Sequence, residues 1–137
     1  MTFDEARDVM VGVFYSAWKA LAPAPVVWTD VPEDVPETET EWARVTVRHA
    51  TGGQGSLAGA DGAKRWDRSG TLFVQVFAPV GDGSTRAYSA AQLVANAFQD
   101  ARGLSVWFRN IRINEVGTSG AFEQINVLVD FTYDDVR

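Results

Sequence analysis

The sequence has no cysteine and only one histidine among its 137 residues. Without cysteine the chain has no disulfide, no thiolate nucleophile and no cysteine-ligated metal. A zinc site or a serine-histidine-aspartate triad would have to use His49, but the sequence shows neither a zinc-ligand spacing nor a nucleophile-elbow motif. We therefore expect no catalytic residues, no metal site and no cofactor.

The sequence also lacks an apolar run near the roughly 18 residues that a membrane-spanning helix needs. Its first ten residues, "MTFDEARDVM", are acidic and amphipathic, whereas a signal peptide is basic and then apolar. We expect no membrane partner. The composition, 46% hydrophobic and 22% charged, is ordinary for a globular protein. The length favours a single domain over residues 1–137.

The chain has fewer positive than negative residues, so its net charge is −6. The stretch "DVPEDVPETETE", residues 30–41, holds six acidic residues and no lysine or arginine. Specific nucleic-acid binding needs clustered cations, so we do not expect it here. Two prolines exclude a helix over this stretch. We expect either a plain surface connection or an acidic patch, with Glu33, Asp34 and Glu37, that faces a basic partner.

A glycine-rich stretch, "GDGST" at residues 81–85, follows an apolar run and looks at first like a phosphate-binding loop. A loop of that kind needs a lysine before the serine or threonine, and none is present. Asp82 would also repel a phosphate group. We therefore expect Gly81 and Gly83 to turn the chain and Ser84 or Thr85 to cap the helix that follows.

Hydrophobic periodicity predicts two helices, one over about 3–21 and one that ends near Gly103. Alternating patterns predict strands at 26–30, 41–50, 66–78, 104–116 and 121–133. The glycine-rich residues 51–63 should form a flexible loop. The order α-β-β-β-α-β-β predicts an α+β fold, with a mainly antiparallel sheet of four to five strands and two helices packed on one face.

Tryptophan is abundant, with five residues in the chain. Alternation places Trp42 on the same strand face as Arg44 and Arg48. Trp66 stands in the most basic stretch, "KRWDR", whose cations are Lys64, Arg65 and Arg68. Most tryptophans of a small domain fill its core, but aromatic residues beside arginine are typical of protein interfaces. These residues are our predicted contacts with further subunits or with a partner protein.

Four segments carry a resemblance to a known family: "PVVWTDVPEDVP", "EWARVTV", "RWDRSGTLFVQVFAPVGDGSTRAYSAAQLVANAF" and "FEQINVLVDFTYD". Together they resemble the tail terminator, or tail completion, proteins of long-tailed bacteriophages from Pro25 onward. The central motif of that family is matched here by one arginine and by glycine, proline and apolar residues: Arg68, Gly70, Leu72, Val74, Val76, Phe77, Pro79, Gly81 and Gly83.

The resemblance implies a structural virion protein that forms a cyclic homo-oligomer, usually a hexamer, at the head-proximal end of the tail tube. Such a ring stops tube polymerisation and presents a surface for head-tail joining. Its implied partners are further copies of the chain, the major tail tube protein and a head-tail connector protein. DNA would only pass through the lumen. The protein would be found in the host cytoplasm during assembly. Another neck component, such as an adaptor or head-closure protein, and a small-molecule-binding domain remain alternatives.

Overall fold

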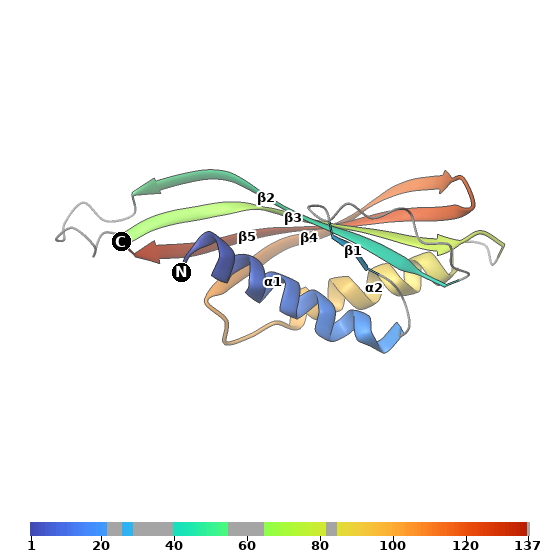
Figure 1. Ribbon diagram of the computed structural model, residues 1–137, viewed down its shortest axis with the longest axis horizontal. Coiled ribbons are helices and arrows are strands. Elements are labelled where there is room, and N and C mark those ends of the chain that lie inside the picture. The colour runs from blue at the N-terminus through green and yellow to red at the C-terminus, as the bar shows by residue number, and fades with distance from the viewer. Residues whose placement is uncertain (22–25, 29–39, 55–64, 82–84, 137) are drawn as a thin grey trace.

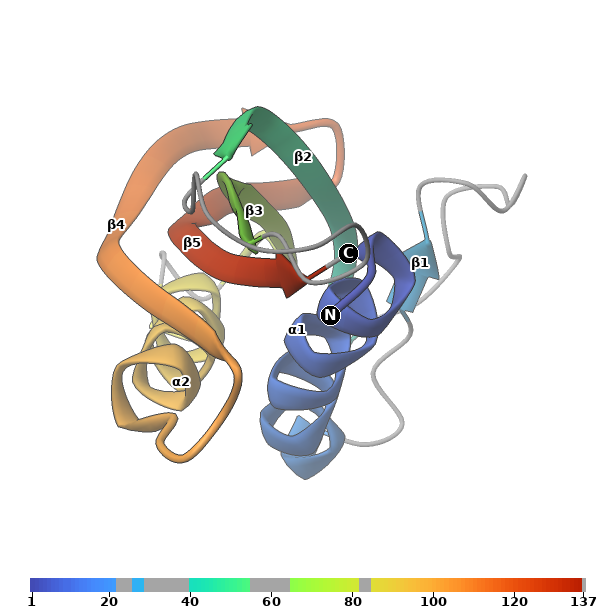
Figure 2. The ribbon, with the colours of Figure 1, turned by 90° about the vertical axis from the view of Figure 1, so that its left-hand side faces the viewer.

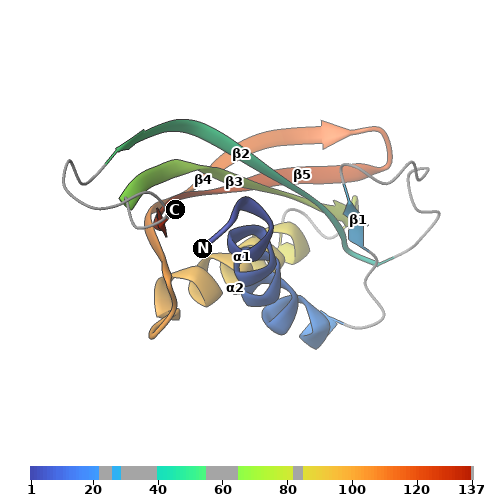
Figure 3. The same ribbon diagram turned by 60° about the vertical axis from the view of Figure 1, so that its left-hand side comes forward.

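A computed structural model of the chain describes residues 1–21, 26–28, 40–54, 65–81 and 85–136. Two α-helices lie on one face of a curved five-stranded sheet, and the other face carries no helix (Figures 1 and 3). This arrangement confirms the expected α+β class and the element order. No helix in the described ranges is long and apolar enough to cross a membrane.

The sheet has the strand order β1-β2-β3-β5-β4. The short strand β1 (Val26–Trp28) runs parallel to β2 (Trp42–Gln54), and all other neighbours are antiparallel. The long central strands are β3 (Arg65–Pro79) and β5 (Phe122–Val136). Strand β4 (Val106–Ser119) lies at one edge and curves over the side of the molecule that holds the second helix (Figure 2).

The first helix, α1 (Phe3–Trp18), begins as its sequence predicts, because the Thr2 hydroxyl accepts a hydrogen bond from the Glu5 amide at 3.2 Å. A short 3-10 turn (Lys19–Leu21) follows it. The second helix, α2 (Thr85–Asp100), ends just before Gly103, whose φ of +71° is the left-handed conformation that glycine adopts freely. The proposed cap Ser84 lies outside the described residues.

The core lies between the helices and the inner face of the sheet. Every second residue of β3 from Gly70 to Ala78, and of β5 from Ile125 to Asp135, is buried there, because side chains alternate between the two faces of a strand. The largest fully buried side chains include Met10, Phe14, Trp18, Leu72, Val74, Val76, Val94, Phe98, Val127, Phe131 and Tyr133. Trp18, expected on a second apolar stripe of α1, packs in this core and stacks on Phe14, whereas Tyr15 is 53% exposed.

Two boundaries differ from the sequence-based expectation. Strand β2 continues through the glycines to Gln54, which pairs with Trp66, after a register shift between His49 and Gly52. Residues 51–54 of the expected loop are therefore strand, because pairing with β3 extends a strand that local composition would end, and residues 55–63 lie outside the described residues. Strand β3 begins at Arg65, so the basic stretch 64–68 is mostly strand and not a turn.

Candidate functional site

The face of the sheet opposite the helices, called here the outer face, is a surface that no described element covers (Figure 3). Its residues are the alternate positions to the buried ones on each strand. Cross-strand pairs place Thr46 beside Phe73 and Phe73 beside Leu128, which makes an apolar centre. Polar and charged residues surround that centre.

Four arginines border the outer face. Arg44 and Arg48 come from β2, as the alternation predicts, and pair in register with Gln75 and Thr71. Arg109 and Arg112 come from β4 on the other side. Within the described residues, no carboxylate lies within 4 Å of the cationic groups of Arg44, Arg48 or Arg109. The outer face is therefore cationic in a chain that is acidic overall.

Sequence reasoning missed Arg109 and Arg112, because strict alternation puts residues three apart on opposite faces. The strand is irregular between them. Arg109 pairs with Asp130 and Arg112 pairs with Leu128, so three residue steps along β4 lie opposite two residue steps along β5. Asn110 takes up this extra residue with a φ of +53°. Asparagine tolerates that conformation better than most residues, which is the only signal of the bulge in the sequence.

Asp130 is the acidic residue nearest the centre of this face. Its carboxylate accepts hydrogen bonds from Asn110 and Thr71 at 3.0 and 2.9 Å and lies 3.3 Å from Arg112. These contacts, led by the Asn110 hydrogen bond, hold the pKa of Asp130 below its ordinary value. Asp130 is therefore ionised and satisfied within its own chain, and no carboxylate of the described residues pairs with the other three arginines.

One end of the outer face holds an aromatic pocket of about 410 Å³. The Trp42 and Phe77 rings stack at 3.9 Å between centroids, and Phe122 meets Trp42 edge-on at 5.8 Å. Trp42 is only 2% exposed, so it forms part of the pocket wall and does not protrude. The guanidinium of Arg44 lies 5.8 Å from the Trp42 ring centre, within the range of a cation–π contact.

The structure divides the predicted basic cluster between the two faces of β3. Arg65 is exposed and lies 3.7 Å from Asp67 and 4.0 Å from Asp134. Trp66 is half-buried on the helix side, where the Arg68 guanidinium lies 5.7 Å from its ring. Successive residues of a strand point in opposite directions, so Arg65 and Arg68 do not share one face of β3. Lys64 lies outside the described residues, as do the acidic Glu33, Asp34 and Glu37.

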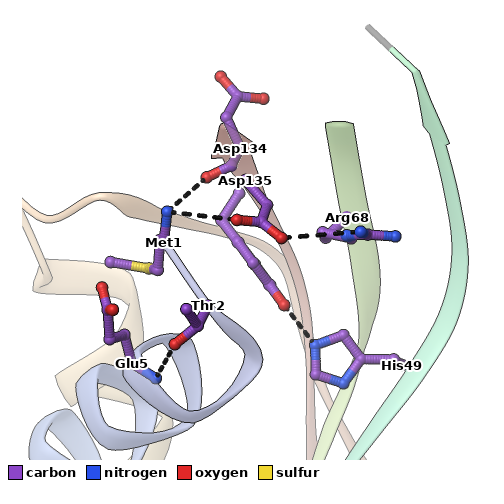
Figure 4. A network of polar contacts seen from close by, with 8 residues as sticks. Met1, Thr2, Glu5, His49, Arg68, Asp134 and Asp135 are labelled. Carbon is purple, nitrogen blue, oxygen red and sulfur yellow. Dashed lines mark hydrogen bonds and ion pairs between the residues drawn. The ribbon is translucent and has the colours of Figure 1, made fainter. Parts of the chain in front are cut away.

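Arg68 belongs to a polar network between the start of α1 and the end of β5 (Figure 4). Its guanidinium lies 3.6 Å from the buried carboxylate of Asp135, and the amino group of Met1 lies 3.7 Å from the same carboxylate. His49 lies 2.7 Å from the Tyr133 hydroxyl. Burial and, secondly, the Arg68 charge lower the pKa of His49, so its neutral ring can accept that hydrogen bond. This network fastens α1 to the sheet.

Glu41, the last acid of the stretch 30–41, is tied to α2, because Arg86 Nε donates to its Oε1 at 2.7 Å. This hydrogen bond lowers the pKa of Glu41 below the ordinary 4.5. We expect Glu41→Gln to reduce the free energy of unfolding by about 1 kcal/mol at pH 7. A group whose pKa falls on folding stabilises the protein only while it is ionised. The difference should therefore shrink as the pH drops below 4.5 and through the lower pKa of the folded state.

Urea unfolding of Glu41→Gln, Arg86→Gln and the double variant at pH 7 and at low pH measures this tie as a double-mutant cycle. A coupling energy that stays the same at both pH values would contradict an ionic contribution.

In the described ranges, no three histidine, aspartate or glutamate residues cluster in a way that could hold a metal ion.

The chain is similar to known proteins in two comparisons. A family model described as "Phage tail terminator protein" matches residues 7–127. A solved structure matches with a TM-score of 0.71 and 23% sequence identity, over 100% of this chain and 98% of the other. At that identity the match establishes a shared fold. The search of curated proteins gives no match.

Proposed function

This chain belongs to the phage tail terminator family, and from that membership we propose that it closes the tail tube as a ring at the head-proximal end. Membership makes it a structural protein of the virion tail. In the proposed role, the ring stops the addition of tube subunits and then presents a surface to the head-tail connector protein. DNA passes through the lumen without specific recognition. The family match over residues 7–127 is the observation that carries this proposal.

The edge strand β4 supports assembly with further copies of the chain. No described strand pairs with its outer side, so its backbone groups there are open to a partner strand. Its exposed apolar side chains are Trp107, Ile113 and Val116, at 57%, 45% and 50% exposure. The opposite edge of the sheet belongs to β1 and β2. A head-to-tail contact between two different edges is the type that closes into a ring.

Tube protein polymerised in vitro, with and without this protein, tests the proposed role. We expect tubes to stop growing when the protein is added, and gold-labelled protein to sit at one end of each tube. Light scattering should then show a closed oligomer, which we propose to be a hexamer. Tubes that elongate unchanged, together with binding to isolated head connectors, would favour the alternative of a head-closure protein.

Trp66 remains a proposed contact between subunits. Because it is only half-buried in the single chain, Trp66→Ala should leave the monomer folded. Truncation of an interface tryptophan commonly costs more than 1 kcal/mol, so we expect assembly to weaken about tenfold. Sedimentation of the variant beside Trp66→Phe, which keeps an aromatic ring, measures this effect. A Trp66→Ala protein that unfolds would show that the ring serves the core.

Arg68→Glu is not a suitable charge reversal for testing whether the basic residues beside Trp66 contribute to assembly. The new carboxylate would lie beside the buried Asp135, with which Arg68 now pairs. Two carboxylates at that site would destabilise the monomer itself. Arg65→Glu is the better variant, because Arg65 is exposed and its ion pairs, at 3.7 and 4.0 Å, are with the exposed Asp67 and the partly buried Asp134.

A further inference from the structure

The aromatic pocket offers hydrogen-bond donors for which the described chain supplies no acceptor. The indole N–H of Trp42 is buried and has no hydrogen-bond partner among the described residues. The Arg44 guanidinium beside it has no carboxylate within ion-pair distance there. A buried N–H without an acceptor is costly, and a guanidinium favours a carboxylate. The pocket therefore suits an acidic ligand with apolar groups that can lie on Phe77 and Phe122.

The proposed ring creates a second requirement for acid at this face. If β4 of one copy faces the β1–β2 edge of the next, the arginines of both edges approach each other. Arg48 stands near one edge, and Arg109 and Arg112 stand near the other. Like charges across a strand junction are destabilising. An acidic segment between the copies would remove this repulsion.

We infer that the aromatic pocket of one copy binds the acidic segment, residues 30–39, of a neighbouring copy. Residues 30–39 carry five acids, no cation and two Val-Pro pairs, which match the cationic rim and the aromatic wall. The segment joins β1 to β2, so it belongs to the edge that a head-to-tail ring brings to the next subunit. The inference rests on the proposed ring and names the contact that sets its direction.

The basic residues of the stretch 64–68 are a weaker destination for this segment. Arg65 lies near Asp67 and Asp134, and Arg68 pairs with the buried Asp135. By contrast, Arg44, Arg48 and Arg109 have no such neighbour in the described chain. Among the described residues, the outer face therefore offers more unpaired positive charge than the stretch 64–68.

The absence of cysteine allows a clean cross-linking test. Gln124→Cys at the pocket is mixed with a second protein that carries Glu37→Cys, under mild oxidation and at concentrations where rings form. We expect a covalent dimer, which can arise only between copies. Asn96→Cys on α2, an exposed helix position, replaces Gln124→Cys as the control and should cross-link at least tenfold more slowly. Arg44→Glu added to the pocket protein should slow the reaction to a similar degree.

Three results would overturn the inference. Rings without the expected cross-link would exclude the pocket while leaving the ring intact. Equal reaction of the control position would show random encounters. A chain with both cysteines that cross-links within itself under dilute, monomeric conditions would show that the segment of the same chain fills the pocket.

A peptide experiment separates this inference from the ring itself. A synthetic peptide of residues 29–40 is titrated calorimetrically into a protein whose own segment carries Glu33→Gln, Asp34→Asn and Glu37→Gln. We expect binding that weakens at least tenfold when the peptide's acids become amides, or when the protein carries Arg44→Glu or Trp42→Phe. Absence of binding overturns the pocket assignment. If the protein binds the peptide but never forms rings, the pocket assignment is supported and only the ring proposal is contradicted.

Discussion

Replacing Gly70 with alanine is expected to reduce the free energy of unfolding more than the same replacement at any other described glycine. A Cβ atom at this position of β3 would lie 2.1 Å from the Arg48 carbonyl oxygen and 2.8 Å from His49 Cα. It would also lie 2.8 Å from Phe131 Cζ. Backbone atoms cannot rotate away as a side chain can. We expect a loss of about 3 kcal/mol or more, because overpacking at a rigid site shifts the backbone itself.

Gly12→Ala on α1 is the matched control, because a Cβ there meets nothing within 4 Å. Alanine is the better helix former, so this variant should gain about 0.5–1 kcal/mol. Urea unfolding monitored by tryptophan fluorescence measures both variants. A Gly70→Ala protein within 0.5 kcal/mol of the parent would contradict the close approach of β2 to β3.

Trp107→Ala is expected to have the largest effect on assembly. Trp107 is 57% exposed on the open edge of the sheet, so its removal should hardly change the free energy of unfolding of the monomer. A tryptophan that becomes buried between subunits is a typical hot spot, worth about 2 kcal/mol or more. We therefore expect a dissociation constant about 30-fold larger for each junction.

Tyr15→Ala provides the comparison, because Tyr15 is similarly exposed, at 53%, but lies on α1. Sedimentation of both variants over a concentration series measures the two effects. Stronger weakening by Tyr15→Ala would move the subunit contact from the β4 edge to the helical layer. Equal and small effects would remove β4 from the interface altogether.

Local sequence patterns were sufficient for much of the fold. The capping box at Thr2, the strand alternation around Val45 and the left-handed glycine at 103 each depend on residues a few positions apart. The position of Trp42, Arg44 and Arg48 on one face followed from the same alternation. The family motif and the absence of cysteine pointed to a structural role.

Long-range pairing decided what local patterns could not. The ends of β2 and β3 depend on each other, since Gln54 is held in a strand by Trp66. That pairing extends β3 to Arg65 and places Arg65 and Arg68 on opposite sides of the strand. The bulge at Asn110 brought Arg109 and Arg112 together on the outer face.

The sequence by itself therefore determined the class of fold, the order of its elements and the family. Only the tertiary structure decided which charges are already paired and which surface is left for a partner. The reason is physical: helix and strand periodicity are properties of neighbouring residues, whereas burial, register and ion pairing depend on residues far apart in the chain. Asp135 and Arg68 are 67 positions apart and meet only because β3 and β5 are neighbours.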